Sequence, residues 1–431
     1  MKHNPRAVAA SLIAEALAGH SLKERFAEKS QRLSESQRPL CRELVYGTLR
    51  EWPRLDALLT ELLTKPLRAK DRDVLALMGI GIYQLEQMRL PSHAAVSETV
   101  NAVQGLGKGW AKGLTNGVLR NYQRQQSALE ATLAPSARAA LPAWLFKQLQ
   151  REWPESLEVI GTAARTRPPM HLRVNSKQTE RDPLLAQLAQ NGIEARSHPR
   201  VDSAIVLASG IDVSQLPGFS AGAVSVQDAS AQLAAPLLRP APGERILDAC
   251  AAPGGKSCHI AELQPDLERL IAADISADRL ERVRENRDRL GLNFELMESD
   301  LRNPVTPLQP AQFDAILVDA PCSASGVLRR NPDIKVIRQP EDIARFATLQ
   351  REILSGVWPL LKPGGRLLYA TCSILSAEND EVIQWAASAL PGATIKPLKH
   401  PQAEPTRYGI QCLPSLDEGD GLYYGLLEKH A

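Results

Sequence analysis

The sequence predicts a multidomain protein with an all-α N-terminal domain, a small α+β middle domain and a doubly wound α/β domain at the C-terminus. Residues 1–130 carry apolar side chains at helical spacing, whereas residues 236–431 alternate short apolar strands with amphipathic helices. A chain of 431 residues is also too long for one ordinary hydrophobic core, so several domains are expected.

The N-terminal domain, residues 1–130, is predicted to be helical throughout. RPLCRELVYGTLREWPRLDALLTELL and DRDVLALMGIGIYQLEQMRLP place apolar residues three and four apart over several turns. This part is basic, because residues 1–150 hold 21 Lys and Arg against 13 Asp and Glu, while the remainder holds 30 against 36. Such asymmetry suggests contact with a polyanion, although a solvated helical surface explains the charge equally well.

The middle domain, residues 131–235, mixes strands and helices. RPPMHLRVNSKQ alternates as a strand, RDPLLAQLAQNGI follows as a helix, and SAIVLASG and AVSVQDAS are further strand candidates. Arg173 lies in the first strand among other basic residues. This β-α-β arrangement presents a basic surface to the same polyanion, or it is a spacer that packs on the C-terminal domain. The sequence leaves both interpretations open.

The C-terminal domain, residues 236–431, is predicted to hold a parallel sheet with helices on both faces. The expected strands are ERILDAC, RLIAADI, NFELMESD, FDAILVDA and GRLLYATC. Ligands of such sheets bind at the carboxyl ends of the strands, and the unusual residues of this sequence gather there.

A glycine loop, LDACAAPGGKS, follows the first of these strands. Gly254 and Gly255 allow the backbone to approach a ligand closely, and the next helix offers free N–H groups. Asp274, Asp300 and Asp319 end the following strands, where an acid suits a ribose hydroxyl or an adenine amino group. One such acid is explained by helix capping, but three around one glycine loop predict a nucleoside-bearing cofactor. A hydride carrier and S-adenosylmethionine both fit.

Two of the six cysteines lie at strand ends and are each followed by serine: Cys322 in DAPCSASG and Cys372 in YATCSIL. An acid, a proline and a cysteine suit chemistry on a planar base, in which the acid holds a ring nitrogen and a thiol adds to carbon. Dehydrogenases need no paired cysteines, which favours S-adenosylmethionine. No C-x-x-C pair or His cluster accompanies the cysteines, so neither a metal site nor a disulfide is expected.

Long motifs carry a family resemblance. DACAAPGGKSCHIAEL, AADIS, VDAPCSASGVLRRNPDIK and YATCSILSAENDEVI resemble the Sun-type RNA cytosine-5 methyltransferases, and LVYGTLR, VSETVNAV and LTNGVLRNY resemble the RNA-binding domain of the NusB antitermination factor. The resemblance covers essentially the whole chain and is strongest to bacterial members that act on one cytosine of small-subunit (16S) rRNA. It implies a Rossmann-like class I methyltransferase domain with S-adenosyl-L-methionine as cofactor.

The resemblance also assigns roles to residues. Cys372 is implied to be the nucleophile, Cys322 to assist product release and Asp319 to orient the base. Asp274 would hold the ribose and Asp300 would lie near the adenine. The cofactor loop would comprise Ala251, Ala252, Pro253, Gly254, Gly255, Lys256 and Ser257. Sequence reasoning alone does not choose between the two cysteines, because DNA cytosine-5 methyltransferases attack with the Pro-Cys cysteine.

Basic residues are the candidates for RNA contact. Arg120 and Arg124 lie in the N-terminal domain, and GVLRRNPDIKVIRQ follows the Pro-Cys loop directly. The full set is Arg120, Arg124, Arg173, Arg329, Arg330 and Lys335. The last three would clamp phosphates on either side of an extruded base, unless the segment is an ordinary charged helix entry.

Two other functions remain open on the sequence: a non-catalytic RNA-binding or assembly factor, and a DNA cytosine-5 methyltransferase. The intact cysteines and Asp319 argue against the first, and the N-terminal RNA domain argues against the second. The N-terminus lacks a signal-peptide pattern and no run of 18 apolar residues occurs, so a cytoplasmic protein without a membrane span is expected. We also expect a monomer that acts on free or early-assembly rRNA.

Overall fold

The computed structural model describes residues 4–304, 308–416 and 418–430, without the side chain of Glu24. The chain forms two compact units. The first comprises Met1–Arg167 and Leu328–Pro340, and the second comprises Pro168–Val327 and Glu341–Ala431. The sequence predicts three domains with boundaries near residues 130 and 235, which is a finer division than these two units. Those boundaries stay predictions.

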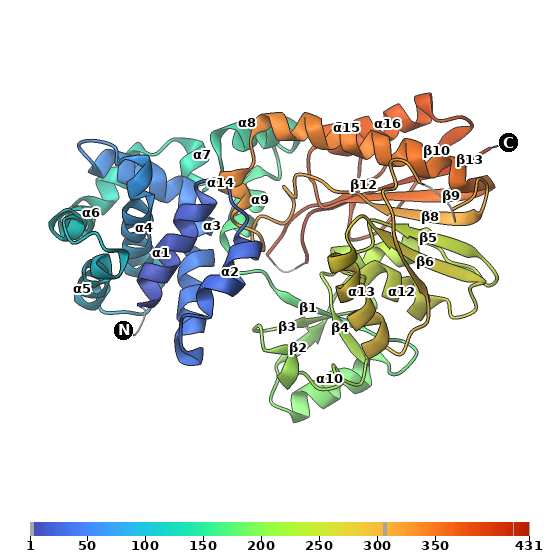
Figure 1. Cartoon of the computed structure of the whole chain (residues 1–431), viewed down its shortest axis with the longest axis horizontal. Coiled ribbons are helices and arrows are strands. Elements are labelled where there is room, and N and C mark those ends of the chain that lie inside the picture. Colours follow the sequence, from blue (N-terminus) through green and yellow to red (C-terminus); the bar gives the residue numbers. More distant parts are fainter. Residues whose placement is uncertain (1–3, 305–307, 417, 431) are drawn as a thin grey trace. The chain divides into compact units, whose positions relative to one another are not determined.

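The described part of the first unit is all-α (Figure 1), which includes residues 4–130, where helices were predicted. Its α-helices are α1 (Pro5–Ala16), α2 (Leu22–Ser30), α3 (Arg38–Leu62), α4 (Arg72–Gln87), α5 (Ser92–Ala102), α6 (Ala111–Thr132), α7 (Pro135–Arg138), α8 (Ala143–Glu152), α9 (Leu157–Arg165) and α14 (Ile334–Ile337). Short 3-10 turns precede α3 and α4 and follow α5, at Glu35–Gln37, Ala69–Asp71 and Val103–Leu106.

The local sequence explains how these helices begin and what they bury. Asn4 caps α1 by accepting the Arg6 N–H at 2.9 Å, and Pro5 occupies the first helical position, where its missing N–H costs nothing. Leu12 and Ile13 of α1 are fully buried in one core with side chains of α3 and α4. Burial of these apolar stripes is the main stabilising contribution to this unit.

The short helix α14 belongs to the first unit although its sequence lies between elements of the second. It packs on α3, and Val336 lies against the apolar core of the helical unit. The chain therefore leaves the second unit after Val327 and returns to it at Glu341.

The second unit begins with a four-stranded antiparallel sheet, which confirms a small α+β domain in the middle of the chain. The strand order is β2-β3-β1-β4, and α10 packs on β2 and β3. The elements are β1 (Met170–Val174), α10 (Arg181–Gln190), β2 (Ala195–Ser197), β3 (Ala204–Leu207), the 3-10 turn Val213–Gln215 and β4 (Val224–Val226). The sequence did not indicate β2, which is only three residues long.

The larger sheet has nine strands in the order β11-β12-β13-β9-β8-β5-β6-β7, and β10 also pairs with β13. The strands are β5 (Arg245–Ala249), β6 (Arg269–Asp274), β7 (Glu295–Glu298), β8 (Phe313–Asp319), β9 (Leu361–Thr371), β10 (Ala393–Lys396), β11 (Glu404–Pro405), β12 (Ile410–Cys412) and β13 (Leu422–Lys429). Strands β5 to β9 are parallel, as predicted, whereas β13 adds antiparallel to β9. The antiparallel extension was not predicted.

Helices cover both faces of this sheet. Successive residues of a strand point to opposite faces, so neighbouring residues of one strand lie in different cores. Ile246 of β5 lies in a core with α11, α12 and α13, whereas Leu247 lies in a core with α15 and α16. These helices are α11 (Ala234–Leu238), α12 (Gly255–Leu263), α13 (Ala277–Arg289), α15 (Pro340–Val357) and α16 (Asp380–Ala389). The remaining 3-10 turns are Ser230–Leu233, Trp358–Leu360 and Ser376–Glu378.

Strand β5 has β6 on one side and β8 on the other, so the connections after β5 and after β8 run in opposite directions across the sheet. Loops diverge at such a switch point and leave room for a ligand at the carboxyl ends of the strands. No helix in the described part of the chain is long and apolar enough to cross a membrane.

Candidate active site

The glycine loop connects β5 to α12 at the switch point of the sheet. Gly254 has φ +94°, and a Cβ at this position would lie 2.8 Å from Cγ1 of Val283. Glycine is therefore required here both by conformation and by the close approach to α13. Gly255 opens α12, so the free N–H groups of that helix face the carboxyl edge of the sheet.

Asp274 ends β6 beside this loop and is almost completely buried, with 1% of its surface exposed. Its carboxylate accepts the backbone N–H groups of Ala252 and Ser276, each at 3.2 Å. Arg279 donates to the same carboxylate at 3.2 Å and to the Ala252 carbonyl at 3.1 Å. Asp274 thus joins the glycine loop to the start of α13.

Asp300 lies just beyond β7 and is partly exposed. Arg302 binds its carboxylate through Nε at 2.9 Å and Nη2 at 2.7 Å. This pair lowers the pKa of Asp300. The backbone N–H of Ser299, directly before Asp300, donates to the Asp274 carbonyl at 3.0 Å. The backbone therefore places the two acids at adjacent strand ends.

Asp319 ends β8 and forms an ion pair with Lys256 of the glycine loop. Burial lowers the pKa of Lys256, but the charges of Asp319 and Asp248 outweigh burial and raise it overall. Lys256 is also within electrostatic reach of Cys372. The structure therefore brings together the glycine loop, Asp319 and one of the two cysteines.

Asp248 is a further acid of this site that was not selected from the sequence. It is fully buried in β5 and accepts a hydrogen bond from the hydroxyl of Ser257 in α12. Burial raises the pKa of Asp248 to about 7. The bond between Asp248 and Ser257 holds the first turn of α12 against the end of β5.

The two cysteines lie side by side at the carboxyl edge. Strands β8 and β9 are parallel neighbours, with Asp319 paired to Ala370, so the loops that follow them meet. The sulfur of Cys322 lies 3.3 Å from that of Cys372. Cys372 is partly exposed, whereas Cys322 is buried. The contact with Cys372, together with burial, raises the pKa of Cys322 well above its usual value.

Arg173 is not on a basic surface, which corrects the expectation of an RNA contact at this residue. Only 1% of it is exposed. It binds Glu262 of α12 through Nε at 3.0 Å and Nη2 at 2.8 Å, and Nη1 donates to the carbonyl of Gly255 at 2.7 Å. Strand β1 therefore supports the helix that follows the glycine loop, which agrees with the alternative of a packing domain.

The phosphate clamp expected from Arg329, Arg330 and Lys335 needs correction at Arg329 and Lys335, whereas the RNA contact of Arg330 stays a prediction. Arg329 and Lys335 are buried, with 1% and 3% exposed. Lys335 Nζ donates to the carbonyl of Arg50 at 2.6 Å and to that of Ala140 at 2.9 Å. Arg50 Nε in turn donates to the Arg329 carbonyl at 2.9 Å. Arg330 is half-buried.

Arg120 and Arg124 are exposed on α6, one turn apart. Their side chains contact neighbouring polar groups of the same helix, Gln123 and Asn121. Gly113 and Gly117 lie on the same face, and a Cβ at either would meet nothing within 4 Å among the described residues. This face of α6 is open and basic.

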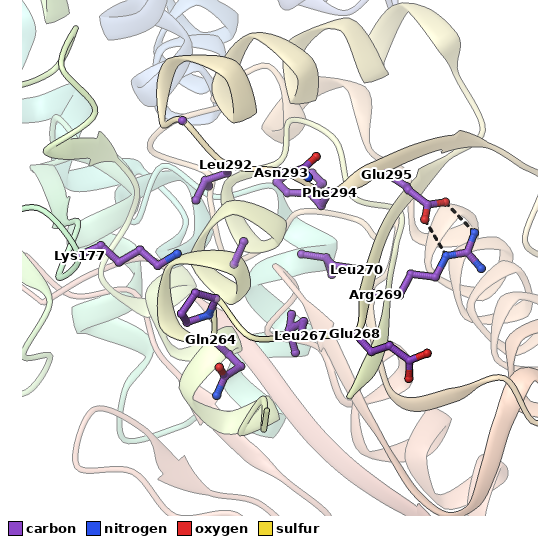
Figure 2. A pocket seen from close by; sticks show the side chains of 13 residues that line it. Lys177, Gln264, Leu267, Glu268, Arg269, Leu270, Leu292, Asn293, Phe294 and Glu295 are labelled. Carbon is purple, nitrogen blue, oxygen red and sulfur yellow. Dashed lines mark hydrogen bonds and ion pairs between the residues drawn. The ribbon is translucent and has the colours of Figure 1, made fainter. Parts of the chain in front are cut away.

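A separate cavity of about 470 Å³ lies at the amino ends of β6 and β7 (Figure 2). Arg269 and Glu295 face one another at its edge through two hydrogen bonds of 2.7 Å. The rest of its lining comprises Lys177, Ala261, Gln264, Pro265, Leu267, Glu268, Leu270, Gly291, Leu292, Asn293 and Phe294. Ligands of such sheets bind at the carboxyl ends of the strands, so this cavity is not the cofactor site.

Comparisons with known proteins identify relatives along the whole chain. Three family models match: the NusB family over residues 3–124, an RsmF/B-like ferredoxin-like domain over residues 141–214 and the 16S rRNA methyltransferase RsmB/F over residues 235–428. Ribosomal RNA small subunit methyltransferase B of Pseudomonas putida is 48% identical, over 99% of both chains. The protein of the same name from Pseudomonas syringae pv. tomato is 47% identical, over 99% of this chain and 97% of its own.

The fold also has a close counterpart among solved structures. The crystal structure of PH0851 aligns with all of this chain and over its own full length, with a TM-score of 0.81 and 23% identity. At that identity the likeness shows the fold alone. It supports the assignment of the helical, ferredoxin-like and α/β parts described above.

Proposed function

The chain belongs to the 16S rRNA methyltransferase RsmB/F family, and we propose that it methylates carbon 5 of one cytosine in 16S rRNA through a covalent adduct with Cys372. One observation carries the proposal. Two thiols lie 3.3 Å apart at neighbouring strand ends, and Lys256 links the glycine loop to Asp319 on the same edge. Next to a methyl donor, one thiol of such a pair can add to the base and the other can assist its release.

The residues that would hold S-adenosyl-L-methionine are the loop Ala251–Ser257, Asp274 and Asp300. The open turn at Gly254 leaves no side chain between the loop and a ligand, and the start of α12 offers N–H donors. Asp274 would accept hydrogen bonds from the ribose hydroxyls. These hydroxyls would compete with Arg279 for the Asp274 carboxylate. When bound, the cofactor supplies the methyl group from its sulfonium.

Cys372 would start the reaction by forming a bond from its thiolate sulfur to C6 of the cytosine. Asp319 would hydrogen-bond N3 and so stabilise the charge that develops on the ring. Addition at C6 would make C5 nucleophilic enough to accept the methyl group that the cofactor supplies. In the release step the C5 proton would pass to solvent water, the C5=C6 double bond would re-form and the C6–S bond would break, which returns the Cys372 thiolate. Cys322 is within 3.3 Å of that sulfur and would assist this step.

The open basic face of α6, with Arg120 and Arg124, would contact phosphates of the RNA and position it without reading its sequence. We propose that the protein acts as a monomer, in the cytoplasm, on free rRNA or on an early assembly intermediate.

Transfer of tritiated methyl groups tests the proposed function directly. Purified protein with labelled S-adenosyl-L-methionine should label 16S rRNA that was isolated from a strain lacking the enzyme, and nuclease digestion should yield labelled 5-methylcytidine. DNA of matched composition should stay unlabelled. Label in DNA, or none in rRNA while the protein still binds it, would overturn the proposal in favour of a DNA methyltransferase or a non-catalytic RNA-binding factor.

A further inference from the structure

One buried carboxylate, that of Glu378, contacts both cysteine loops. Glu378 ends the 3-10 turn after Cys372 and has no exposed surface. Its Oε1 accepts the backbone N–H of Ser323 at 2.7 Å, and its Oε2 accepts the hydroxyl of Ser323 at 2.5 Å. Oε2 also accepts the hydroxyl of Ser373 at 2.6 Å. Ser323 directly follows Cys322, and Ser373 directly follows Cys372.

The other groups around this carboxylate complete its hydrogen bonding. Gln350 of α15 donates to Oε1 at 3.3 Å. The hydroxyl of Ser325 lies 3.0 Å from that of Ser373 and accepts the Ile374 N–H at 3.0 Å. Burial raises the pKa of Glu378, and the hydrogen bonds from Ser323 and Ser373 oppose that rise. Four donors therefore converge on the carboxylate, which is the arrangement that allows an ionised acid to stay buried.

The backbone ties the same two loops together. The N–H of Gly326 donates to the Cys372 carbonyl at 2.9 Å, and that of Ala320 to the Ala370 carbonyl at the same distance. These bonds fix the two ends of the Pro-Cys loop, and Glu378 holds its middle through Ser323. The carboxylate and the two backbone bonds therefore together hold the Pro-Cys loop against the loop of Cys372.

We propose that Glu378 is a positioning residue that holds the two thiols in register and keeps Cys322 in its protonated form. The assignment of Cys372 as nucleophile and Cys322 as the releasing thiol rests on the proposed function. The difference in reactivity between the two thiols is expected whether or not the proposed function is right. Glu378 acts on the sulfurs through Ser323 and Ser373, each of which directly follows one of the cysteines.

The charge of Glu378 supports the second half of the proposal. A negative charge in a buried site disfavours a second negative charge nearby. Glu378 accordingly contributes to the raised pKa of Cys322, after the contact with Cys372 and burial. Tyr369 also faces this site, and its hydroxyl donates to the Glu378 carbonyl at 2.7 Å, so it does not neutralise the carboxylate. Lys256 interacts electrostatically with Cys372.

Alkylation of the thiols tests the inference without RNA or cofactor. Iodoacetamide is applied to the full-length protein at constant pH, and mass spectrometry measures how fast Cys322 and Cys372 are labelled. In the native protein we expect Cys372 to react at least about tenfold faster than Cys322. Iodoacetamide reacts with the thiolate form, and by our proposal Cys322 is held in its protonated form. In Glu378→Gln and Glu378→Ala this ratio should fall at least fivefold. Glu381→Gln is the matched control, since Glu381 is exposed three residues further on.

Single serine variants keep the test decisive if the Glu378 variants do not fold. Ser323→Ala and Ser373→Ala each remove one hydroxyl donor, and each should lower the labelling ratio at least twofold while thermal unfolding stays cooperative. In turnover, Glu378→Gln should lower kcat at least tenfold and change the KM for rRNA and cofactor less than twofold. An unchanged labelling ratio in every folded variant would overturn the inference.

The two proposals can fail separately. If the ratio depends on Glu378 but the native protein transfers no methyl group to rRNA, the proposed function is refuted and the positioning role stands. If methyl transfer occurs but the ratio does not change, the positioning role is refuted and the proposed function stands.

Discussion

Two polar segments, one that begins at the last residue of strand β8 and one that comes shortly after it, belong to different units of the molecule. Residues 319–326 stay in the second unit, where their polar atoms bond to Glu378, Lys256 and the neighbouring loop. Residues 328–340 join the first unit, where buried Lys335 donates to the Arg50 carbonyl of α3 and the Arg329 carbonyl accepts from Arg50. The difference teaches that basic residues that follow an active-site loop in the sequence need not face the substrate, because their nitrogen atoms can donate to buried backbone carbonyls instead.

The largest effects are expected at the two thiols. Cys372→Ala should abolish methyl transfer and form no covalent species, because nothing can then add to C6. Cys322→Ala should still add to the base but stall at elimination, so a protein–RNA adduct should accumulate on denaturing gels. The double variant should show no adduct. Adduct in Cys372→Ala but not in Cys322→Ala would mean that the two roles are reversed.

Lys335→Met should strongly destabilise the first unit, because the carbonyls of Arg50 and Ala140 each lose a buried donor. An unsatisfied buried group costs about 1–3 kcal/mol. Thermal unfolding measures the loss, and Arg124→Met is the matched control because Arg124 is exposed. A phosphate clamp predicts the opposite pattern, namely unchanged stability and weaker RNA binding with a smaller salt dependence.

The pH dependence of stability sharpens the same comparison. Burial lowers the pKa of Lys335 to about 7. The negative charge of Glu51 raises this pKa, whereas the positive charges of Arg165 and Arg50 lower it further. Between pH 7 and the ordinary lysine pKa of about 10.4, the unfolded chain binds the proton and the folded chain does not. The free energy of unfolding should therefore rise with pH over this window. Chemical denaturation at several pH values should show this rise in the native protein and not in Lys335→Met.

Arg173→Ala should weaken the cofactor site from a distance. It leaves Glu262 without its buried partner and removes a donor from the Gly255 carbonyl. We expect the Kd of S-adenosyl-L-methionine to rise about tenfold, which is about 1.4 kcal/mol. Calorimetry measures the Kd, with exposed Arg196→Ala of β2 as the control. A loss of rRNA affinity with unchanged cofactor affinity would restore the interpretation of Arg173 as an RNA contact.

The smallest effect is expected on the surface of the first unit. Reversal of charge at Arg120 and Arg124 should weaken rRNA binding several-fold at low salt. The slope of log K against log salt should become shallower by roughly 0.7–0.9 for each phosphate that the protein no longer neutralises. Binding measured at three salt concentrations gives the slope. Unchanged affinity would reduce this face of α6 to a solvated surface.

Local patterns in the sequence predicted most of the fold. Strands β5 to β9 are short apolar runs between amphipathic helices, and the apolar periodicity of the first 130 residues is helical. The antiparallel partners β10 to β13 were missed, because which strands pair is a long-range property. The inserted position of α14 was missed for the same reason, since its docking depends on carbonyls of Arg50 and Ala140.

The candidate site divides in the same way. The glycine loop, the strand-end acids and the two Cys-Ser pairs could be selected because their residue types are unusual in their places. Arg173 and Lys335 were misjudged because charge was taken as a sign of exposure, while each is buried by partners far along the chain. Glu378 was not selected, although the repeated serine after each cysteine was a signal that both loops share one acceptor.

The insertion of residues 328–340 makes the helical unit hard to separate from the rest of the protein. The polypeptide joins the two units at three places: after Arg167, after Val327 and after Pro340. A truncated gene that begins near residue 236 would encode α14 without α3, leaving Val336 and Lys335 with no core to enter. Expression of the methyltransferase half alone should therefore require a short linker in place of residues 328–340, and exchange of the N-terminal unit between relatives should require exchange of that segment as well.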